Sequence, residues 1–181
     1  MKKTKHKPGL LWITGLSGCG KTTVSEIIYH NLKKNYSNVI FLDGDLLRKK
    51  LKIKKQNSFS NKSRERVGLK YVNLCSRLVN DKGKFVIIAV MALIQKVQIE
   101  YKKIQNNYDV FLDVPIKELK RRDAKGLYKN LKNKEIKNMS GLDIGYDKPY
   151  KPSLYLKWKR NMTPLKISKK ILKLIEKIGK N

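Results

Sequence analysis

The stretch that decides the fold is Gly15-Leu16-Ser17-Gly18-Cys19-Gly20-Lys21-Thr22, which fits the pattern G-x-x-x-x-G-K-T. It follows a short apolar run, residues 10–14, that we predict to be a buried parallel strand. It precedes residues 21–34, where apolar side chains recur at helical spacing. A strand, a glycine-rich turn and a helix in this order are the context in which the pattern binds phosphate. Backbone N–H groups and the positive end of the helix dipole would then surround the phosphate oxygens.

Three side chains of this loop have separate predicted roles. Lys21 is expected to reach the β- and γ-phosphates of a nucleotide, and the Thr22 hydroxyl is expected to bind Mg²⁺. Cys19 occupies a variable position of the pattern, where a small side chain is sufficient. A redox role for this thiol is the alternative.

Strands and helices alternate along the rest of the chain. Further strands are predicted at 38–42, 84–91, 108–113 and 154–158, and further helices at 63–80 and 167–178. This order predicts an α/β protein of the P-loop NTPase fold, with a predominantly parallel five-stranded sheet and helices on both faces. We expect a single P-loop domain over residues 1–181. Two stretches lack an apolar period, 49–62 and 124–152, and the second is predicted to be a lid.

Two carboxylates follow the second predicted strand, in the segment Asp43-Gly44-Asp45. Ligands of open α/β sheets bind at the carboxyl ends of the strands. One carboxylate would hold Mg²⁺ through water, and the other would orient the proton of an attacking hydroxyl. The alternative is an ordinary Asp-Gly turn with solvated carboxylates.

Arginine is scarce in this chain and occurs only at positions 48, 64, 66, 77, 121, 122 and 160. The guanidinium group offers a planar fork of donors to phosphate or sulfate, which lysine does not. The arginines next to the predicted site segments are therefore candidates for anion binding: Arg48, Arg64, Arg66, Arg121 and Arg122. Arg77 and Arg160 are interpreted as ordinary surface residues.

The chain carries 43 Lys and Arg against 14 Asp and Glu, a net charge of +29. Such an excess is typical of proteins that bind nucleic acid or anionic membranes, but here it is almost all lysine, which favours background compositional bias. No apolar run approaches the roughly 20 residues of a membrane-spanning helix. Two cysteines cannot form a disulfide framework, and the basic N-terminus lacks the apolar region of a signal peptide. We therefore expect a cytoplasmic protein.

Four ordered blocks of the chain resemble adenylylsulfate (APS) kinases. They are residues 12–23 with the phosphate loop, 42–48 with Asp43-Gly44-Asp45 and Arg48, 122–129 with the lid motif R-D-x-K-G-L-Y-K, and 135–143. The resemblance covers roughly residues 10–152. It implies transfer of the γ-phosphoryl group of ATP to the ribose 3′-hydroxyl of APS, with Mg²⁺ as cofactor, a mobile lid and often a homodimer.

The resemblance also assigns residues by matching position. Loop residues 15–23, Thr23 included, would bind the ATP phosphates, and Arg122 would lie near the nucleotide on the ATP side of the lid. Asp43 and Asp45 would serve Mg²⁺ and the acceptor hydroxyl. The acceptor nucleotide would be held by Arg48, one of Arg64 and Arg66, Lys137 and Asn138.

The sequence departs from the family at the acceptor base. Members that use APS have two phenylalanines that sandwich the adenine, and Val90 and Met139 take their places here. Stacking on an aromatic face contributes about 1–3 kcal/mol per base. APS kinase-like proteins of surface-polysaccharide pathways, one of which phosphorylates cytidine diphosphoramidate, lack the aromatic pair in similar fashion. Leu74-Cys75 also resembles them.

Several functions stay open at this point. APS is the default acceptor, and a cytidine diphosphate derivative is the alternative within the family. An RNA-binding protein or polynucleotide kinase is the alternative from another class, supported by the charge, although the APS-type lid argues against a nucleic-acid partner. A family member that binds ATP without turnover is the fourth hypothesis.

Overall fold

The computed structural model describes residues 3–51, 60–123, 126, 128–129, 141–142 and 144–178. Most of the predicted lid and two residues predicted to bind the acceptor, Lys137 and Asn138, lie outside these residues, as does Met139.

Five strands form one sheet in the order β2-β3-β1-β4-β5, and all neighbouring strands are parallel. They are β1 (Gly9–Thr14), β2 (Val39–Asp43), β3 (Phe85–Val90), β4 (Asn107–Asp113) and β5 (Leu154–Lys157). Every residue of β1 and β3 is buried, because these inner strands are covered on both faces. The predicted fold class, an α/β protein with a parallel five-stranded sheet, is confirmed.

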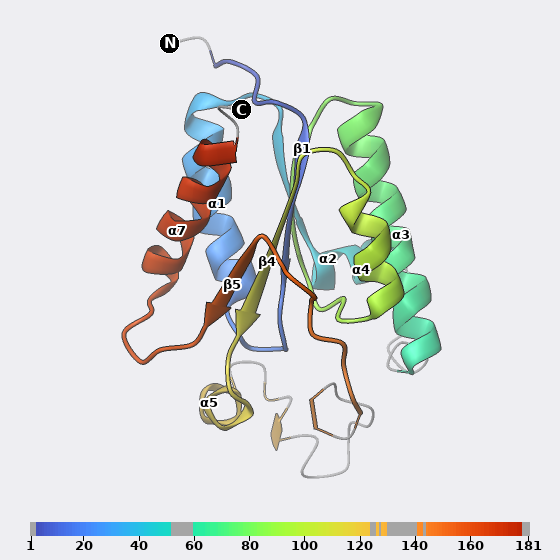
Figure 1. The fold of residues 1–181 in the computed structure, drawn as a ribbon, viewed down its shortest axis with the longest axis vertical. Helices are drawn as coiled ribbons and strands as arrows, with labels where there is room; N and C mark the ends of the chain where they lie inside the picture. Colours follow the sequence, from blue (N-terminus) through green and yellow to red (C-terminus); the bar gives the residue numbers. More distant parts are fainter. Residues whose placement is uncertain are drawn as a thin grey trace.

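Helices cover both faces of the sheet (Figure 1). α1 (Lys21–Asn35) and α7 (Pro164–Ile178) lie on one face, while α3 (Asn61–Asn80) and α4 (Gln95–Lys102) lie on the other. The inward side chains of β1 alternate between these two layers. Leu11 and Ile13 belong to the core under α1 and α7, whereas Leu10 and Trp12 belong to the core under α3 and α4.

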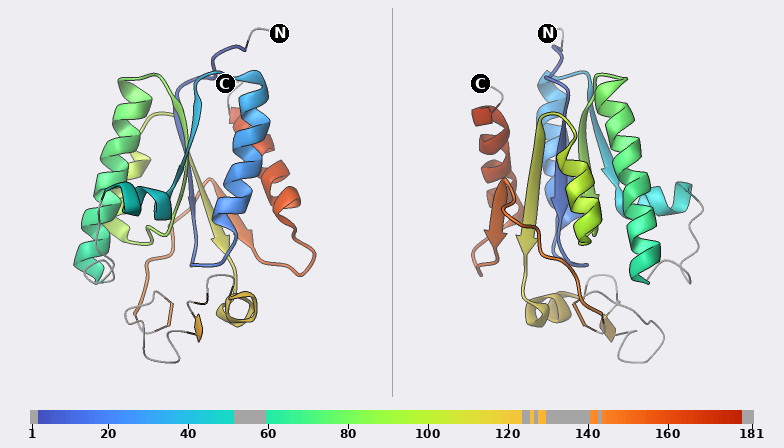
Figure 2. Two further views of the ribbon diagram at one scale, coloured as in Figure 1. Left: turned by 180° about the vertical axis from the view of Figure 1, so that it is seen from behind. Right: turned by 45° about the vertical axis from the view of Figure 1, so that its right-hand side comes forward.

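The carboxyl ends of the strands meet at one end of the molecule, and the N-terminal arm and the end of α7 lie at the other (Figures 1 and 2). The short helices α2 (Gly44–Lys50) and α5 (Ile116–Arg122) follow β2 and β4 toward that first end. It is therefore the end at which the predicted phosphate loop, the Asp43-Gly44-Asp45 turn and the described parts of the predicted lid lie.

The sequence did not predict the short helices α2, α4 and α5. The prediction of an irregular stretch at 49–62 is wrong at its two ends, since residues 49–50 complete α2 and residues 61–62 begin α3. Ser60 caps α3 by accepting a hydrogen bond from the backbone N–H of Ser63 at 3.3 Å. In the described part of the chain, no helix combines the length and the apolar character needed to cross a bilayer.

Candidate active site

The predicted phosphate loop joins β1 to α1 and is shaped by glycines with positive φ. The φ angles are 154° at Gly15, 78° at Gly18 and 96° at Gly20, values that side chains with a Cβ rarely adopt. A Cβ on Gly15 would also lie 2.7 Å from the carbonyl oxygen of Leu112 on β4. The Lys21 ammonium donates hydrogen bonds to the carbonyl oxygens of Gly15 at 2.8 Å and Leu16 at 2.9 Å. The loop therefore curls around the Lys21 ammonium.

Cys19 fills the inside of the same loop. Its side chain is buried, and its Sγ atom lies 3.8 Å from the Lys21 Nζ atom. A Cβ on Gly15 would meet this sulfur at 2.7 Å, so the two small residues share one tight space. This contact agrees with the packing interpretation of Cys19. Thr23, at the start of α1, is exposed.

Asp43 links the phosphate loop to α2. Its Oδ2 atom accepts a hydrogen bond from the Thr22 hydroxyl at 2.8 Å. Its Oδ1 atom accepts from the backbone N–H groups of Asp45 at 2.9 Å and Leu46 at 3.1 Å, and so caps α2. A hydroxyl and a carboxylate oxygen side by side at a phosphate loop are the hard donors that Mg²⁺ prefers, with phosphate and water completing its shell. Within the described residues, no three His, Cys, Asp or Glu side chains form a metal cluster of their own.

Gly44 lies where β2, β3 and α3 converge. A Cβ at this position would lie 2.9 Å from the Cγ1 atom of Val90 and 3.0 Å from the carbonyl oxygen of Ala89. The Tyr71 hydroxyl of α3 donates a hydrogen bond to the Gly44 carbonyl at 3.2 Å. The backbone between the two aspartates is therefore held from both sides, while the side chain of Asp45 is exposed.

The structure separates the two arginines that sequence reasoning left as alternatives. Arg64 is 7% exposed and lies on the inward face of α3, three residues before Val67. Arg66 is exposed. Arg48, on α2, is partly exposed and contacts the hydroxyl of Tyr71. Arg64 on the inward face of α3 and Arg48 on α2 are thus the two arginines on the elements that flank Gly44.

A small cavity of about 160 Å³ adjoins the phosphate loop on its other side. Its lining combines Cys19 and Gly20 of the loop with Arg122, Trp158 and Met162. Arg122 therefore lies beside the loop.

Both arginines at the end of α5 are bound to one carboxylate. The Nε atom of Arg122 lies 2.7 Å from Glu118 Oε1, and that of Arg121 lies 2.8 Å from Glu118 Oε2. Hydrogen bonds from Arg121 and then Arg122 lower the pKa of Glu118 to about 2. Glu118 thereby fixes the direction in which Arg122 points.

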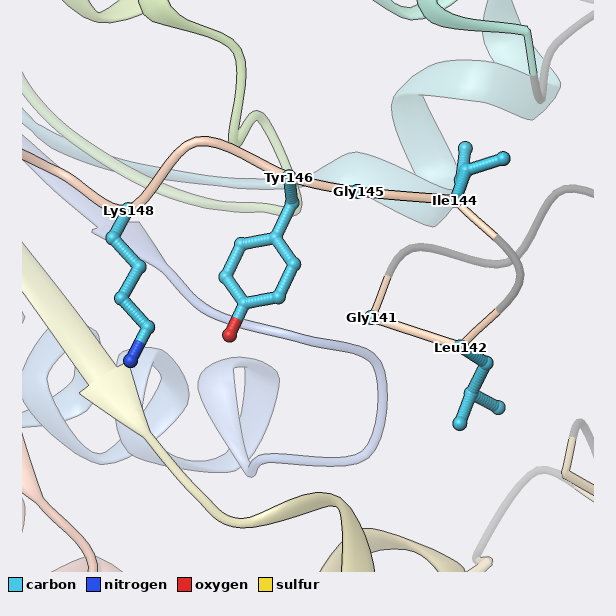
Figure 3. Close-up of a pocket in the computed structure, with 6 residues that line it drawn as sticks. All are labelled: Gly141, Leu142, Ile144, Gly145, Tyr146 and Lys148. Carbon is cyan, nitrogen blue, oxygen red and sulfur yellow. The ribbon is translucent and has the colours of Figure 1, made fainter.

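The described end of the predicted lid lies over the phosphate loop and borders an open hollow of about 450 Å³ (Figure 3). Tyr146 and Lys148 line this hollow and point the same way, toward the end of β4. The Lys148 ammonium lies 3.6 Å from Asp113 Oδ2, and the Tyr155 hydroxyl donates to the same oxygen.

Asp147, between Tyr146 and Lys148, fixes this segment to α4. The Asp147 carboxylate accepts from the backbone N–H of Gln95 at 2.8 Å, and the Gln98 side chain donates to the Asp147 carbonyl at 2.7 Å. The beginning of the lid, in contrast, contacts the loop itself, since the Tyr128 hydroxyl donates to the Ser17 carbonyl at 3.0 Å. Burial raises the pKa of Tyr128 to about 12, so this hydroxyl keeps its proton at neutral pH.

Sequence reasoning did not identify Tyr71, Glu118 or Tyr128 as parts of this site. Tyr71 fits the apolar period of its helix, so its position in the sequence indicates packing and no part in a site. Glu118 precedes Arg121 and Arg122 by three and four residues, a spacing that could have indicated the ion pairs.

Comparisons with known proteins agree with this geometry. The family profile described as adenylylsulphate kinase matches residues 7–157. The chain is 37% identical over 146 residues to a cytidine diphosphoramidate kinase of Campylobacter jejuni, covering 80% of this chain and 84% of that protein. It is 32% identical over 151 residues to an adenylyl-sulfate kinase of Picosynechococcus, covering 83% of this chain and 84% of that enzyme.

Among solved structures, the Mycobacterium tuberculosis APS kinase CysC in complex with AMPPNP and APS superposes with a TM-score of 0.83 at 28% identity, covering 94% of this chain and 99% of that one. This likeness extends over nearly the whole fold described above. The chain therefore belongs to the adenylylsulfate kinase family and is an ATP-dependent phosphotransferase.

Proposed function

We propose that this kinase transfers the γ-phosphoryl group of ATP to the ribose 3′-hydroxyl of a small anionic nucleotide. The hydrogen bond between Thr22 and Asp43, 2.8 Å long, supports this proposal most directly, because it joins the phosphate loop to the carboxylate turn on the neighbouring side of the sheet. Donor and acceptor can then meet at one point between two rigid elements.

On the donor side, the loop amides and Lys21 would bind the phosphates of ATP. Arg122 and Trp158 line the cavity next to the loop and offer a cation and an aromatic face to the rest of the nucleotide. Thr22 and Asp43 would hold Mg²⁺ together with phosphate oxygens. When bound, Mg²⁺ neutralises charge on the phosphates.

The transfer itself needs no covalent enzyme intermediate. The bond between the γ-phosphorus and the β–γ bridging oxygen breaks as the ribose 3′-oxygen bonds to the same phosphorus, and ADP leaves. Asp45 would orient the hydroxyl and accept its proton. Lys21, by moving from the loop carbonyls to the phosphates, would stabilise charge on the transferred group.

On the acceptor side, Arg48 and Arg64 are the cations near α2 and α3 that suit an anionic nucleotide. Lys137 and Asn138 remain proposed acceptor ligands on the strength of the resemblance alone. The predicted homodimer and cytoplasmic location also remain predictions.

We further propose that the preferred acceptor is a cytidine diphosphate derivative such as cytidine diphosphoramidate. The 37% identity to the Campylobacter jejuni kinase supports this choice. So does Val90, which is 3% exposed and packs close to Gly44, because it offers no aromatic face to a base. A purine has more ring surface to stack than a pyrimidine, so the loss of an aromatic face penalises adenine more.

APS is the second candidate acceptor. The match to the Picosynechococcus enzyme at 32% identity supports it, as does the likeness to the Mycobacterium tuberculosis structure that holds AMPPNP and APS.

One acceptor panel tests these alternatives. Purified protein would be incubated with γ-labelled ATP, Mg²⁺ and one acceptor each: cytidine diphosphoramidate, APS, CDP, ADP and an RNA oligonucleotide with a 5′-hydroxyl. We expect the highest kcat/KM with the cytidine diphosphoramidate. A higher value with APS would reverse the order of the two candidates. Labelling of the oligonucleotide alone would indicate a polynucleotide kinase, and labelling of none would contradict the proposed reaction.

A further inference from the structure

The hydroxyl of Tyr71 joins two parts of the acceptor side of the site. Tyr71 is 3% exposed on the inward face of α3, and its hydroxyl donates to the Gly44 carbonyl at 3.2 Å. The Arg48 guanidinium lies beside the same hydroxyl and acts to lower the pKa of Tyr71. Gly44 and Arg48 are four residues apart and therefore share one face of α2. One buried oxygen thus connects the backbone between Asp43 and Asp45 to a cation one helical turn later.

This arrangement leaves Arg48 able to bind a ligand. A guanidinium group carries five N–H donors, so its contact with Tyr71 leaves donors for an anionic group. Arg48 is partly exposed, whereas Tyr71 is buried beneath it. Without the hydroxyl, the long side chain of Arg48 would be free to occupy several rotamers, and part of the binding free energy would be lost in ordering it.

The electrostatics of the pair also keep Tyr71 a donor. Burial raises the pKa of Tyr71, Arg48 lowers it, and the nearby Asp45 and Asp43 carboxylates raise it. The outcome is a raised pKa, so the hydroxyl keeps its proton at neutral pH and can donate to Gly44.

We propose that Tyr71 is a positioning residue for the acceptor, which holds the Arg48 guanidinium and the Asp45-bearing turn in the arrangement that binds the anionic nucleotide. This inference rests on the proposed function, in which Arg48 and Asp45 act on the acceptor. Tyr71 itself does not touch the reacting atoms.

The first test is Tyr71→Phe, which removes one oxygen and keeps the ring. We expect KM for the acceptor to rise about tenfold, since the bond to Gly44 and the polar neighbour of Arg48 are both lost, while KM for ATP stays within about twofold. An unchanged acceptor KM in a folded Tyr71→Phe protein would overturn the proposal.

Tyr101→Phe is the matched control. Tyr101 is equally buried, and its hydroxyl donates to Asp109 Oδ2 at 3.3 Å under α4, away from α2. We expect this variant to lower the melting temperature and leave the acceptor KM unchanged. An equal rise in acceptor KM in both variants would show a general packing effect and contradict the positioning role.

A double-mutant cycle tests whether Tyr71 acts through Arg48. In an Arg48→Ala background, Tyr71→Phe should change the acceptor KM by less than about twofold, because the group that it positions is absent. If the two substitutions multiplied as independent effects, Tyr71 would not act through Arg48, and the proposal would be wrong.

A measurement without enzyme activity separates this inference from the proposed function. NMR relaxation of the Arg48 Nε–Hε group provides this measurement, with its signal identified by its loss in Arg48→Lys. The group should be ordered on the nanosecond timescale in wild-type protein and become mobile in Tyr71→Phe. A mobile signal in the wild type would overturn the inference. If that signal were ordered but no acceptor were phosphorylated, the proposed function would fail, and the acceptor role of Tyr71 with it.

Discussion

Replacing Asp43 by Asn and by Ala separates the two tasks of this carboxylate. One oxygen caps α2 through the N–H groups of Asp45 and Leu46, and the other accepts from Thr22. Asn is as good an N-cap as Asp, so Asp43→Asn should leave stability nearly unchanged. Asp43→Ala removes the cap at a cost of about 1 kcal/mol, which lowers the melting temperature by about 2–4 °C in a chain of this size.

Both variants should lose phosphoryl transfer by about 100-fold or more, because each removes the negative charge next to Thr22 that would hold Mg²⁺. Initial rates with labelled ATP over a range of Mg²⁺ concentrations, together with thermal unfolding, measure the two effects separately. The reasoning fails if Asp43→Asn keeps more than about a third of the wild-type rate. It also fails if activity falls in proportion to the melting temperature, since the charge would then have no role beyond the cap.

Three further predictions concern the loop, the carboxylate turn and α5. Lys21→Ala should abolish transfer in a protein with an unchanged circular dichroism spectrum, and a variant with measurable turnover would exclude the proposed role. Gly44→Ala places a Cβ 2.9 Å from the Cγ1 atom of Val90. The clash should lower the stability by about 1–3 kcal/mol, and kcat should fall as well. Gly83→Ala is the control, because Gly83 has a φ of 58° and open space around it. This variant should lose stability but keep its kcat. A loss of kcat in both glycine variants would contradict a specific role for Gly44. Glu118→Gln should raise KM for ATP about threefold, because it releases Arg122 from its ion pair. Initial rates over a range of ATP concentrations measure this effect, and an unchanged KM would refute the prediction. Because the pKa of Glu118 is lowered to about 2, its stabilising effect should be complete above about pH 5 and should disappear as the pH falls toward 2. Melting temperatures of wild type and Glu118→Gln should therefore converge in acid.

The fold could be predicted from the sequence where elements are long or fully buried. The strands of the sheet are continuous apolar runs, and α1, α3 and α7 are long enough to show a helical period. The helices α2, α4 and α5 have seven, eight and seven residues, which is too short for such a period to emerge. In α4, moreover, Gln98 is buried where an apolar residue would be expected, because it bonds to the Asp147 backbone.

The candidate site divides in a similar way. The phosphate loop and the Asp43-Gly44-Asp45 turn are local motifs whose spacing is fixed by backbone geometry. Both could therefore be predicted from the sequence alone. The choice between Arg64 and Arg66 was available from the helical period, since Arg64 shares its face with Val67 and Tyr71. The bond from Tyr71 to Gly44 joins residues 27 positions apart, and no local pattern predicts such a contact.

The order of the strands places the sites proposed for the two substrates on opposite sides of β1. β1 carries the phosphate loop at the centre, β2 and β3 adjoin the elements proposed to bind the acceptor, and β4 and β5 adjoin the cavity proposed for ATP. Substitutions near Val90 or Tyr71 can therefore reshape one side while the other continues to bind ATP. A gene duplicate of such a kinase could acquire a new acceptor through few substitutions, without changes to the elements proposed to bind ATP. This layout offers a physical reason why relatives named for a cytidine and for an adenine nucleotide both match one chain at similar identity.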